Sequence, residues 1–229
     1  MDRLFAQMYR HARKAGAQEC CGVVARGPLG LQVVPMENVA PDPFNTFQLD
    51  EQAYAGLFPY AVAVYHSHPK GGSELSPEDR RSAELTGLPH VVIGMGNRTV
   101  SRYVPEKASV QLTGNEYLYG LYDCFSVVED WMLLSQGVRM PSVERPIAAA
   151  ELPEAIESNY SRLGWEQVSD TLQPGDVLLL AEAGKEPHHL AIFAGNGKVL
   201  HHQALGLSVE EVLSRGLRAS VRKVVRHAH

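Results

Sequence analysis

Apolar residues recur at helical intervals within residues 2–15, and this pattern predicts an amphipathic helix that ends at Gly16. The continuous apolar run at residues 61–65 suits a buried strand instead. A helix is expected after Ser76, because serine at the cap, proline at the next position and acids in the first turn favour a helix start. Further strands are expected at residues 20–25, 31–34, 90–95 and 99–104, and a further helix at 51–58.

The regular patterns relax around residues 104–114, where proline, lysine, serine and glycine interrupt them. We place a domain boundary there, which gives an N-terminal domain at 1–108 and a C-terminal domain at 109–229. A chain of 229 residues is long enough for two small domains. Both halves mix helical and strand patterns, so the predicted fold class is α+β, with two mixed α/β domains.

The C-terminal half is predicted to open with a helix at residues 123–134, followed by a proline-rich connector and a helix near 154–163. A turn at Pro174-Gly175-Asp176 then introduces an apolar strand at 177–181. The last predicted strands form a hairpin at 189–193 and 198–202.

Charge and composition limit the classes of function. The chain has 21 Lys+Arg against 26 Asp+Glu, a net charge of −5, so no global basic field favours nucleic acid or anionic lipid. The first residues lack the apolar core of a signal peptide, and the apolar runs are too short to span a bilayer. We therefore expect synthesis in a cytoplasm, no nucleic-acid partner and no membrane insertion.

The chain has three cysteines, a number that argues against a disulfide framework and leaves room for one reactive thiol. Cys20 and Cys21 are expected to be buried strand residues, because adjacent cysteines cannot easily serve one ion. Cys124 is therefore the candidate for a reactive thiol.

Two histidines and an aspartate form the first candidate site. His66 and His68 lie two residues apart, so in an extended segment their side chains point the same way and can hold one ion. Asp79 lies eleven residues beyond His68, in the first turn of the next predicted helix. Two imidazoles and one carboxylate, with a position left for water, are typical of a catalytic zinc site. Two plainer interpretations stay open: a His-x-His pair that binds nothing, and an ordinary helix start at Ser76.

The segment from His66 to Asp79 reads H-S-H, seven residues, then S-x-x-D, and it resembles the motif of the JAMM/MPN+ metalloprotease family. Residues 19–22 resemble the upstream E-x-x-G segment of that family. The resemblance covers roughly residues 1–104 and implies a mixed sheet flanked by helices. Members of the family cleave peptide or isopeptide bonds.

The same resemblance implies a role for five side chains. His66, His68 and Asp79 would bind one Zn²⁺ ion. Glu19 would act as general base and acid, and Ser76 would help to stabilise the tetrahedral oxyanion.

Cys124 opens the second candidate site. It follows Asp123 at a predicted helix start, where the helix dipole and free N–H groups favour the thiolate. His189 begins a downstream strand and His201 lies twelve residues later, and a cysteine, a histidine and a polar third group form a generalised triad. The alternative is a small buried side chain at Cys124 with surface histidines in a hairpin, and the spacing alone favours this alternative.

Residues 123–126, Asp-Cys-Phe-Ser, resemble the nucleophile segment of the NlpC-type cysteine peptidases. Residues 189–201 resemble the H-V-x-I-Y…G-N-G…H segment of that family, and residues 174–176 resemble its usual lead-in. The resemblance covers about residues 110–229 and implies a papain-like fold with a helix packed on an antiparallel sheet. NlpC relatives cut amide bonds in peptidoglycan stem peptides, commonly between γ-D-glutamate and a diamino acid.

By that resemblance Cys124 is the nucleophile, His189 the base and His201 the orienting residue. His188 and His202 do not match the family pattern and are expected on the solvent side.

Family members usually place an oxyanion-assisting tyrosine about twelve residues before the cysteine, where this chain has Leu112. Tyr117, Tyr119 and Tyr122 lie closer to the cysteine, and none of them is assigned this role.

The triad requires a particular hairpin register. A two-residue turn at Asn196-Gly197 would place His189 and His201 on opposite faces of the hairpin, and a loop of odd length would place them on one face. The triad hypothesis predicts the second geometry, and a tight two-residue turn would contradict it.

A JAMM domain followed directly by an NlpC domain within 229 residues resembles the tail-assembly proteins of lambda-like phages. This resemblance implies synthesis in the host cytoplasm, other tail-tip proteins as partners, and action at the tail tip on the host cell wall. Peptidoglycan peptides would be the substrate of the NlpC half, and the JAMM half would trim a tail protein during assembly. Two alternatives stay open: a structural tail-tip component with one or both sites dormant, and a cellular isopeptidase.

Overall fold

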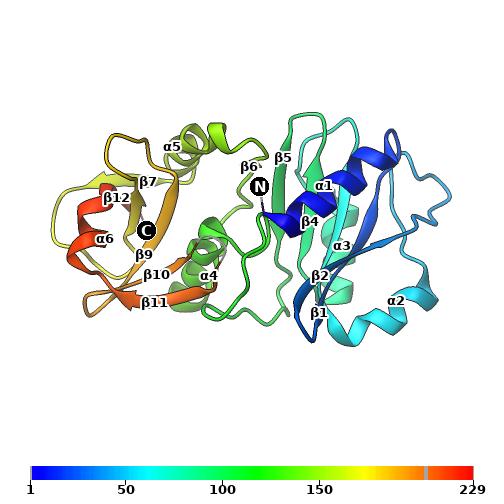
Figure 1. The fold of residues 1–229 in the computed structure, drawn as a ribbon, viewed down its shortest axis with the longest axis horizontal. Coiled ribbons are helices and arrows are strands. Elements are labelled where there is room, and N and C mark those ends of the chain that lie inside the picture. The colour runs from blue at the N-terminus through cyan, green and yellow to red at the C-terminus, as the bar shows by residue number, and fades with distance from the viewer. Residues whose placement is uncertain (1, 204–205, 229) are drawn as a thin grey trace. The chain divides into compact units, whose positions relative to one another are not determined.

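The computed structural model describes residues 2–203 and 206–228 and divides the chain into two compact units (Figure 1). Unit 1 comprises Met1–Ser109, Leu118–Leu121 and Glu144–Ala148, and unit 2 comprises the remaining segments. Each unit combines helices with one six-stranded sheet, so the predicted α+β class is confirmed. The boundary expected between residues 108 and 109 stays a prediction. A single boundary there does not account for Leu118–Leu121 and Glu144–Ala148, two short segments that follow it in the chain but belong to unit 1.

Unit 1 is built on a sheet with the strand order β2-β1-β3-β4-β5-β6. Its only parallel pair among the described residues is β3 with β4, joined by a helix because parallel strands need a crossover. Its elements are α1 (Arg3–Ala15), β1 (Cys21–Gly27), β2 (Gly30–Met36), α2 (Glu51–Leu57), the 3₁₀ helix η1 (Phe58–Tyr60), β3 (Ala61–His68), α3 (Pro77–Thr86), β4 (His90–Gly94), β5 (Thr99–Tyr103) and β6 (Arg145–Pro146).

Helix α1 forms where the apolar spacing predicts it. Asp2 caps its N-terminus, with one carboxylate oxygen accepting a hydrogen bond from Phe5 N at 2.9 Å. The helix buries Phe5, Met8 and Ala12, and Figure 1 shows it lying across the sheet, where it packs against β2 and β3. The amphipathic pattern and its helical period are therefore confirmed.

Strand β3 lies between β1 and β4, and this position explains its apolar sequence. Ala63, Val64 and Tyr65 are at most 1% exposed, as expected for a strand covered on both faces. The strand continues through His68, so His66 and His68 belong to the sheet itself and not to a loop after it. Parallel pairing places His66 beside Val92 of β4.

Unit 2 is built on an antiparallel sheet with the strand order β11-β10-β9-β8-β12-β7. Its elements are α4 (Cys124–Gln136), the 3₁₀ helix η2 (Ala149–Glu151), α5 (Leu152–Arg162), β7 (Trp165–Val168), β8 (Val177–Leu180), β9 (His189–Gly195), β10 (Lys198–His202), β11 (Ser208–Val212), α6 (Arg215–Ser220) and β12 (Val221–His227).

Helix α4 is the main cover of this sheet. It packs on β9 and β10, and its residues Trp131 and Met132 share an apolar cluster with Leu190, Ile192 and Leu200 of those strands. A capping box at Asp123 begins the helix, and Gly137 in the left-handed conformation ends it. The predicted helix on an antiparallel sheet is present.

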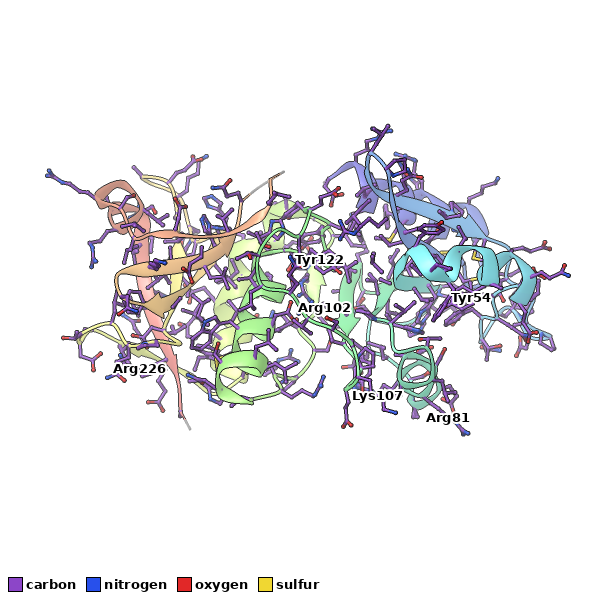
Figure 2. All side chains as sticks on the ribbon, turned by 90° about the horizontal axis from the view of Figure 1, so that it is seen from below. Tyr54, Arg81, Arg102, Lys107, Tyr122 and Arg226 are labelled. Carbon is purple, nitrogen blue, oxygen red and sulfur yellow. The ribbon has the colours of Figure 1, made fainter. Side chains whose placement is uncertain are left out.

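The basic C-terminal stretch forms a strand that the sequence pattern did not reveal. Strand β12 lies between β8 and β7, although its sequence alternates poorly and carries several cations. Arg226, labelled in Figure 2, donates hydrogen bonds to Asp176 at 2.7 Å and to Asp170 at 3.0 Å. These ion pairs join the strand to the turn before β8, so the cation has a structural partner.

Within residues 2–203 and 206–228, no helix combines the length and apolar character that crossing a bilayer requires.

Candidate functional sites

Strand β3 and the start of α3 bring together the three predicted metal ligands. His66 Nε2 lies 3.2 Å from Asp79 Oδ1, and His68 Nε2 lies 3.4 Å from Asp79 Oδ2. One ligand atom from each of the three residues lies within 4.8 Å of the other two. The alternation of β3 puts both rings on one face of the strand, as the spacing predicted.

The surroundings of His66 indicate that these three residues fit a metal ion. His66 is fully buried, and among the described residues neither of its ring nitrogens makes a hydrogen bond. Nε2 has only the Asp79 carboxylate at 3.2 Å near it, and because a buried polar nitrogen without a hydrogen bond is costly, coordination to a metal would satisfy it. Two imidazoles and one carboxylate form a donor set that suits zinc.

Asp79 has a second role as the third residue of α3. Its Oδ2 accepts hydrogen bonds from the backbone N and the hydroxyl of Ser76, both at 2.8 Å. The Ser76 hydroxyl in turn accepts from Asp79 N at 3.1 Å, which completes a capping box. The helix cap therefore fixes the carboxylate that faces the two histidines.

The charges of this cluster are strongly coupled. Burial opposes ionisation of Asp79, but its contacts with His66, His68 and Ser76 lower the pKa of the carboxyl well below its usual range. Burial also lowers the pKa of His66. Burial alone would lower the pKa of His68 too, but Asp79 and the Gly72 carbonyl raise it. The carboxylate is therefore ionised and His66 is neutral, the forms in which they bind metal.

Glu19 lies two residues before the first residue of β1 and is only 7% exposed. Its neighbour Cys20 accepts a hydrogen bond from Ser67 N at 3.1 Å, so the chain at Glu19 runs beside the His-Ser-His segment. Burial raises the pKa of Glu19 to about 7, with Asp79 acting in the same direction and His68 against it. A carboxyl with a pKa near neutrality is suited to proton transfer.

A second buried histidine lies beside His66, with ring centroids 6.1 Å apart, and was missed by sequence reasoning. His90 of β4 is fully buried, and its pKa is lowered to about 3, chiefly by burial. Phe47 stacks on the His66 ring with centroids 4.3 Å apart and also contacts His90. The stacked Phe47 ring holds the His66 ring in place. The predicted strand at residues 90–95 was the only sequence signal that His90 would be buried.

Cys20 and Cys21 are 2% and 0% exposed, so their predicted burial is confirmed, but only Cys21 lies in β1 and Cys20 directly precedes it. Burial raises the pKa of Cys20 to about 11 and that of Cys21 to about 12. Both side chains are free thiols, and neither belongs to the metal cluster.

The hairpin of β9 and β10 has the tight turn that was expected to separate His189 from His201. Gly195 pairs with Lys198 across Asn196 and Gly197, and both turn residues have a positive φ, 51° and 71°. The next pair is Phe193 with Val199, so Ala194 has no opposite residue and forms a β-bulge. The bulge shifts the register by one residue.

This shift brings the two histidines to one face. His201 pairs with Ala191, which shares its face with His189 two residues earlier. His189 Nε2 lies 2.9 Å from His201 Nδ1. The expectation that a two-residue turn rules out this contact was wrong, because it did not consider a bulge.

Glu211 of β11 extends the pair into a chain of three. His201 Nε2 lies 2.7 Å from Glu211 Oε1, and Val199 pairs with Glu211 across the two strands. The His201 side chain is 8% exposed and that of Glu211 is 45% exposed, so the chain ends at the surface. Sequence reasoning missed Glu211 because β11 was not predicted.

Cys124 is the first residue of α4 and is 9% exposed. It belongs to the apolar cluster on the face of Leu190 and Leu200, whereas alternation assigns His189 and His201 to the other face. The structure thus brings His189 and His201 into contact, and it places the Cys124 thiol in the apolar cluster between α4 and the sheet.

His202, expected on the solvent side, is only 1% exposed, so that expectation was wrong for this residue. His202 lies two residues after Leu200 in β10, so its side chain is on the same face of the sheet, the face that α4 covers. Burial lowers the pKa of His202, and the Asp123 carboxylate at the cap of α4 partly offsets this effect. The start of α4 is therefore near the end of β10, the same end of the sheet at which β9 begins with His189.

The comparisons with known families agree with both motifs. The profile of the prokaryotic homologs of the JAB domain matches residues 1–106, and that of the NlpC/P60 family matches residues 114–226. These matches confirm the two predicted family resemblances.

Two phage proteins are similar to much of the chain. Tail tip assembly protein K of Escherichia phage lambda is 35% identical over 152 residues, which are 66% of this chain and 73% of that protein. Tail tip assembly protein K of Escherichia phage N15 is 23% identical over 197 residues, which are 84% and 81% of the two chains. An NlpC/P60 family protein from Bacillus cereus overlaps at 14% identity with a TM-score of 0.35, covering 96% of this chain and 66% of that one, a similarity too low to support a functional argument.

Proposed function

This chain belongs to the family of phage tail tip assembly protein K, and from that membership we propose that it is a tail-tip protein with two amide-hydrolase sites. The N-terminal site would be a zinc-dependent peptidase or isopeptidase, and the C-terminal site a cysteine endopeptidase acting on peptidoglycan stem peptides. The observation that supports the first site best is the fully buried His66 ring, whose nitrogens make no hydrogen bond among the described residues, beside His68 and Asp79.

His66, His68 and Asp79 would hold a Zn²⁺ ion, which would supply Lewis acidity and lower the pKa of water. Glu19 is the proposed proton carrier, because a pKa of about 7 lets it take up a proton and return it to the leaving amine. Ser76 is the proposed oxyanion donor. Its single hydroxyl proton is held by Asp79 at 2.8 Å, so donation to a substrate requires the hydroxyl to rotate.

In the C-terminal site the hydrogen bonds assign protons along the histidine chain. The Glu211 carboxylate can only accept, so His201 donates from Nε2 and keeps Nδ1 unprotonated. That Nδ1 then accepts from His189 Nε2, which leaves His189 Nδ1 as the atom free to take a proton. Burial lowers the pKa of His189 to about 3, so the ring is neutral at pH 7 and its Nδ1 is unprotonated.

Cys124 is the proposed nucleophile. Its place at the first position of α4 exposes it to the helix dipole, which favours the thiolate. The interaction of His202 with Asp123 indicates that α4 begins near the end of β10. His189 begins β9 at the same end of the sheet. Transfer of the Cys124 thiol proton to His189 Nδ1 would give the thiolate that attacks the amide carbonyl, and His189 would return this proton to the leaving amine.

The proposed substrates follow from the two families. Peptidoglycan stem peptides fit the C-terminal site, which would open the host wall locally, and a tail protein trimmed during assembly fits the N-terminal site. The partners would be other tail-tip proteins, with synthesis in the host cytoplasm and action at the virion tail tip.

Hydrolysis of purified cell wall tests the C-terminal site. We expect wild-type protein to release stem-peptide fragments and Cys124→Ala to release none, with Cys21→Ala as the matched cysteine control. If wild type and Cys124→Ala leave the wall equally intact, the wall-hydrolase proposal fails.

A structural tail-tip component with a dormant cysteine site is the second candidate function. The buried position of Cys124 in the apolar cluster of the α4-covered face favours it. The same wall assay separates the two functions, since a dormant site releases no fragments even as wild type.

A further inference from the structure

Glu144 lies beyond residues 1–106, which match the JAB domain, yet it belongs to unit 1. It directly precedes β6, which pairs with β5 through Val100 and Arg145. One carboxylate oxygen of Glu144, Oε1, accepts hydrogen bonds from four donors in the N-terminal domain. The donors are Ser73 N at 3.3 Å, Ser73 Oγ at 3.0 Å, Asn97 Nδ2 at 3.2 Å and Thr99 Oγ1 at 3.2 Å.

Ser73 is the centre of this network. Its side chain is fully buried, and its hydroxyl also lies 2.7 Å from Thr99 Oγ1. Its backbone carbonyl accepts a hydrogen bond from the Ser101 hydroxyl. The peptide after Gly72 is therefore held on both sides, and one of the two partners is Glu144.

The preceding carbonyl, that of Gly72, acts directly on a predicted metal ligand. His68 Nδ1 lies 2.9 Å from Gly72 O, and since a carbonyl only accepts, Nδ1 carries the proton. This leaves Nε2, the atom that faces Asp79 at 3.4 Å, as the nitrogen that a metal ion would bind once its proton is lost. Such a bond from the second ring nitrogen fixes the tautomer and orientation of a metal-binding histidine.

The loop has little room to take up another arrangement. A Cβ atom at Gly94 would lie 2.4 Å from Gly72 C and Ser73 N, and one at Gly96 would lie 2.5 Å from Lys70 O. The loop is thus seated directly on the turn between β4 and β5, with Gly96 N donating to Gly71 O at 3.0 Å. A small shift at Ser73 would move the Gly72 carbonyl with it.

We propose that Glu144 is a positioning residue of the metal centre, which acts through Ser73 and the Gly72 carbonyl to hold His68 in its metal-binding tautomer and orientation. This inference rests on the proposed metal site. Without the Glu144 carboxylate, the buried Ser73 N–H and hydroxyl lose their shared acceptor, and an unpaired buried donor is costly enough to rearrange the loop. A segment from outside the JAB match would then complete the metal site.

The test measures zinc affinity of the full chain by competition with a chelator for wild type, Glu144→Ala, Glu144→Gln and the control Glu151→Ala. Glu151 is an exposed glutamate close by in the sequence. We expect Glu144→Ala to bind zinc about 10-fold more weakly or worse, the usual effect of losing an outer partner of a metal ligand. We expect Glu144→Gln to lose at least about 3-fold, because its neutral amide oxygen is a weaker acceptor, and Glu151→Ala to match wild type.

A second readout needs no metal and would not respond to a merely structural role. Nitrogen NMR of the zinc-free protein reports which ring nitrogen of His68 carries the proton. At a pH high enough for the His68 ring to be neutral, we expect Nδ1–H in wild type and a mixture of tautomers in Glu144→Ala, with partial recovery in Glu144→Gln.

A folded Glu144 variant with zinc affinity within about 3-fold of wild type and an unchanged His68 tautomer would overturn the proposal. If Glu144→Ala does not fold, Glu144→Gln decides by the same two measurements. If wild type itself binds no zinc, the proposed metal function fails, while the tautomer measurement still tests the action of Glu144 on His68.

Discussion

His189 Nε2 and His201 Nδ1 lie 2.9 Å apart, although the hairpin that carries them has a two-residue turn. The contact exists because Ala194 is a bulge residue that moves the register by one position. With Glu211 bound to His201 at 2.7 Å, the pair becomes a chain in which each ring has one protonated and one unprotonated nitrogen. The first prediction concerns the Glu211 end of this chain.

Replacement of Glu211 by glutamine should lower the rate of wall hydrolysis about 10-fold or more, because a partner that orients a catalytic histidine has been weakened. An amide can also donate, so His201 is free to take the other tautomer and His189 Nδ1 loses its assigned role. The matched control is Glu210→Gln, whose carboxylate pairs with Lys198 at 2.8 Å on the other face. The rate of wall hydrolysis is measured for both variants over a range of pH values. Equal rates at every pH would contradict the proposed role of Glu211.

Thiol labelling should separate Cys124 from the other two cysteines. Burial raises the pKa of Cys20 to about 11 and of Cys21 to about 12, so both stay protonated and covered at pH 7. We expect iodoacetamide to modify Cys124 in the folded protein, with its site found by peptide mass spectrometry. Urea-unfolded protein is the control, in which all three thiols should react. Labelling of Cys20 or Cys21 ahead of Cys124 in the folded protein would refute this assignment.

Loss of one metal ligand should abolish zinc uptake. We expect about one zinc ion per chain in wild type and much less in His68→Ala, because two remaining ligands form a weak site. His188→Ala, which removes a histidine of unit 2, is the control. Added zinc should also raise the melting temperature of wild type but not of His68→Ala, since a ligand that binds only the folded state stabilises it. Equal metal content in wild type and His68→Ala would disprove the ligand set.

Glu19 should make the stability of the zinc-free protein depend on pH. Its pKa rises from an ordinary 4.5 to about 7 in the folded state, so between these values the folded chain binds more protons than the unfolded chain. Stability from this group is therefore present below about pH 4.5 and lost as pH rises to about 7. Glu19→Gln should remove this slope, a change of about 3 kcal/mol across the window for the shift from 4.5 to about 7.

Urea unfolding of zinc-free wild type and Glu19→Gln at a series of pH values measures the effect. Glu51→Gln, at an exposed position on α2, is the matched control and should follow wild type. Parallel stability curves for wild type and Glu19→Gln would show that the folded environment leaves the Glu19 carboxyl unperturbed.

The fold was readable from the sequence where local pattern and burial agree. Helix α1 and strand β3 formed as predicted, because a single apolar period determined which residues each buries. Strand β12 was not predicted, because cationic residues interrupt its apolar pattern. The charge of Arg226 is neutralised by ion pairs with Asp170 and Asp176, which lie far from it in the sequence. Such compensation is invisible without the tertiary structure.

The sequence by itself determined the chemical groups and their local geometry. The two-residue spacing of His66 and His68 puts both rings on one side of any extended strand, and Ser76 with Asp79 forms a cap from local bonds alone. The family motifs at these positions and at Cys124 add to this information without requiring long-range contacts.

Only the tertiary structure decided which distant groups meet. Ala194 is an ordinary residue in the sequence, yet its bulge chose the face of His201, because a shift of one residue inverts every side chain of a strand. Glu144 reached Ser73 through pairing of β6 with β5, and Glu211 reached His201 through pairing of β11 with β10. Strand pairing between segments far apart in the chain depends on the whole sheet, and no local pattern encodes it.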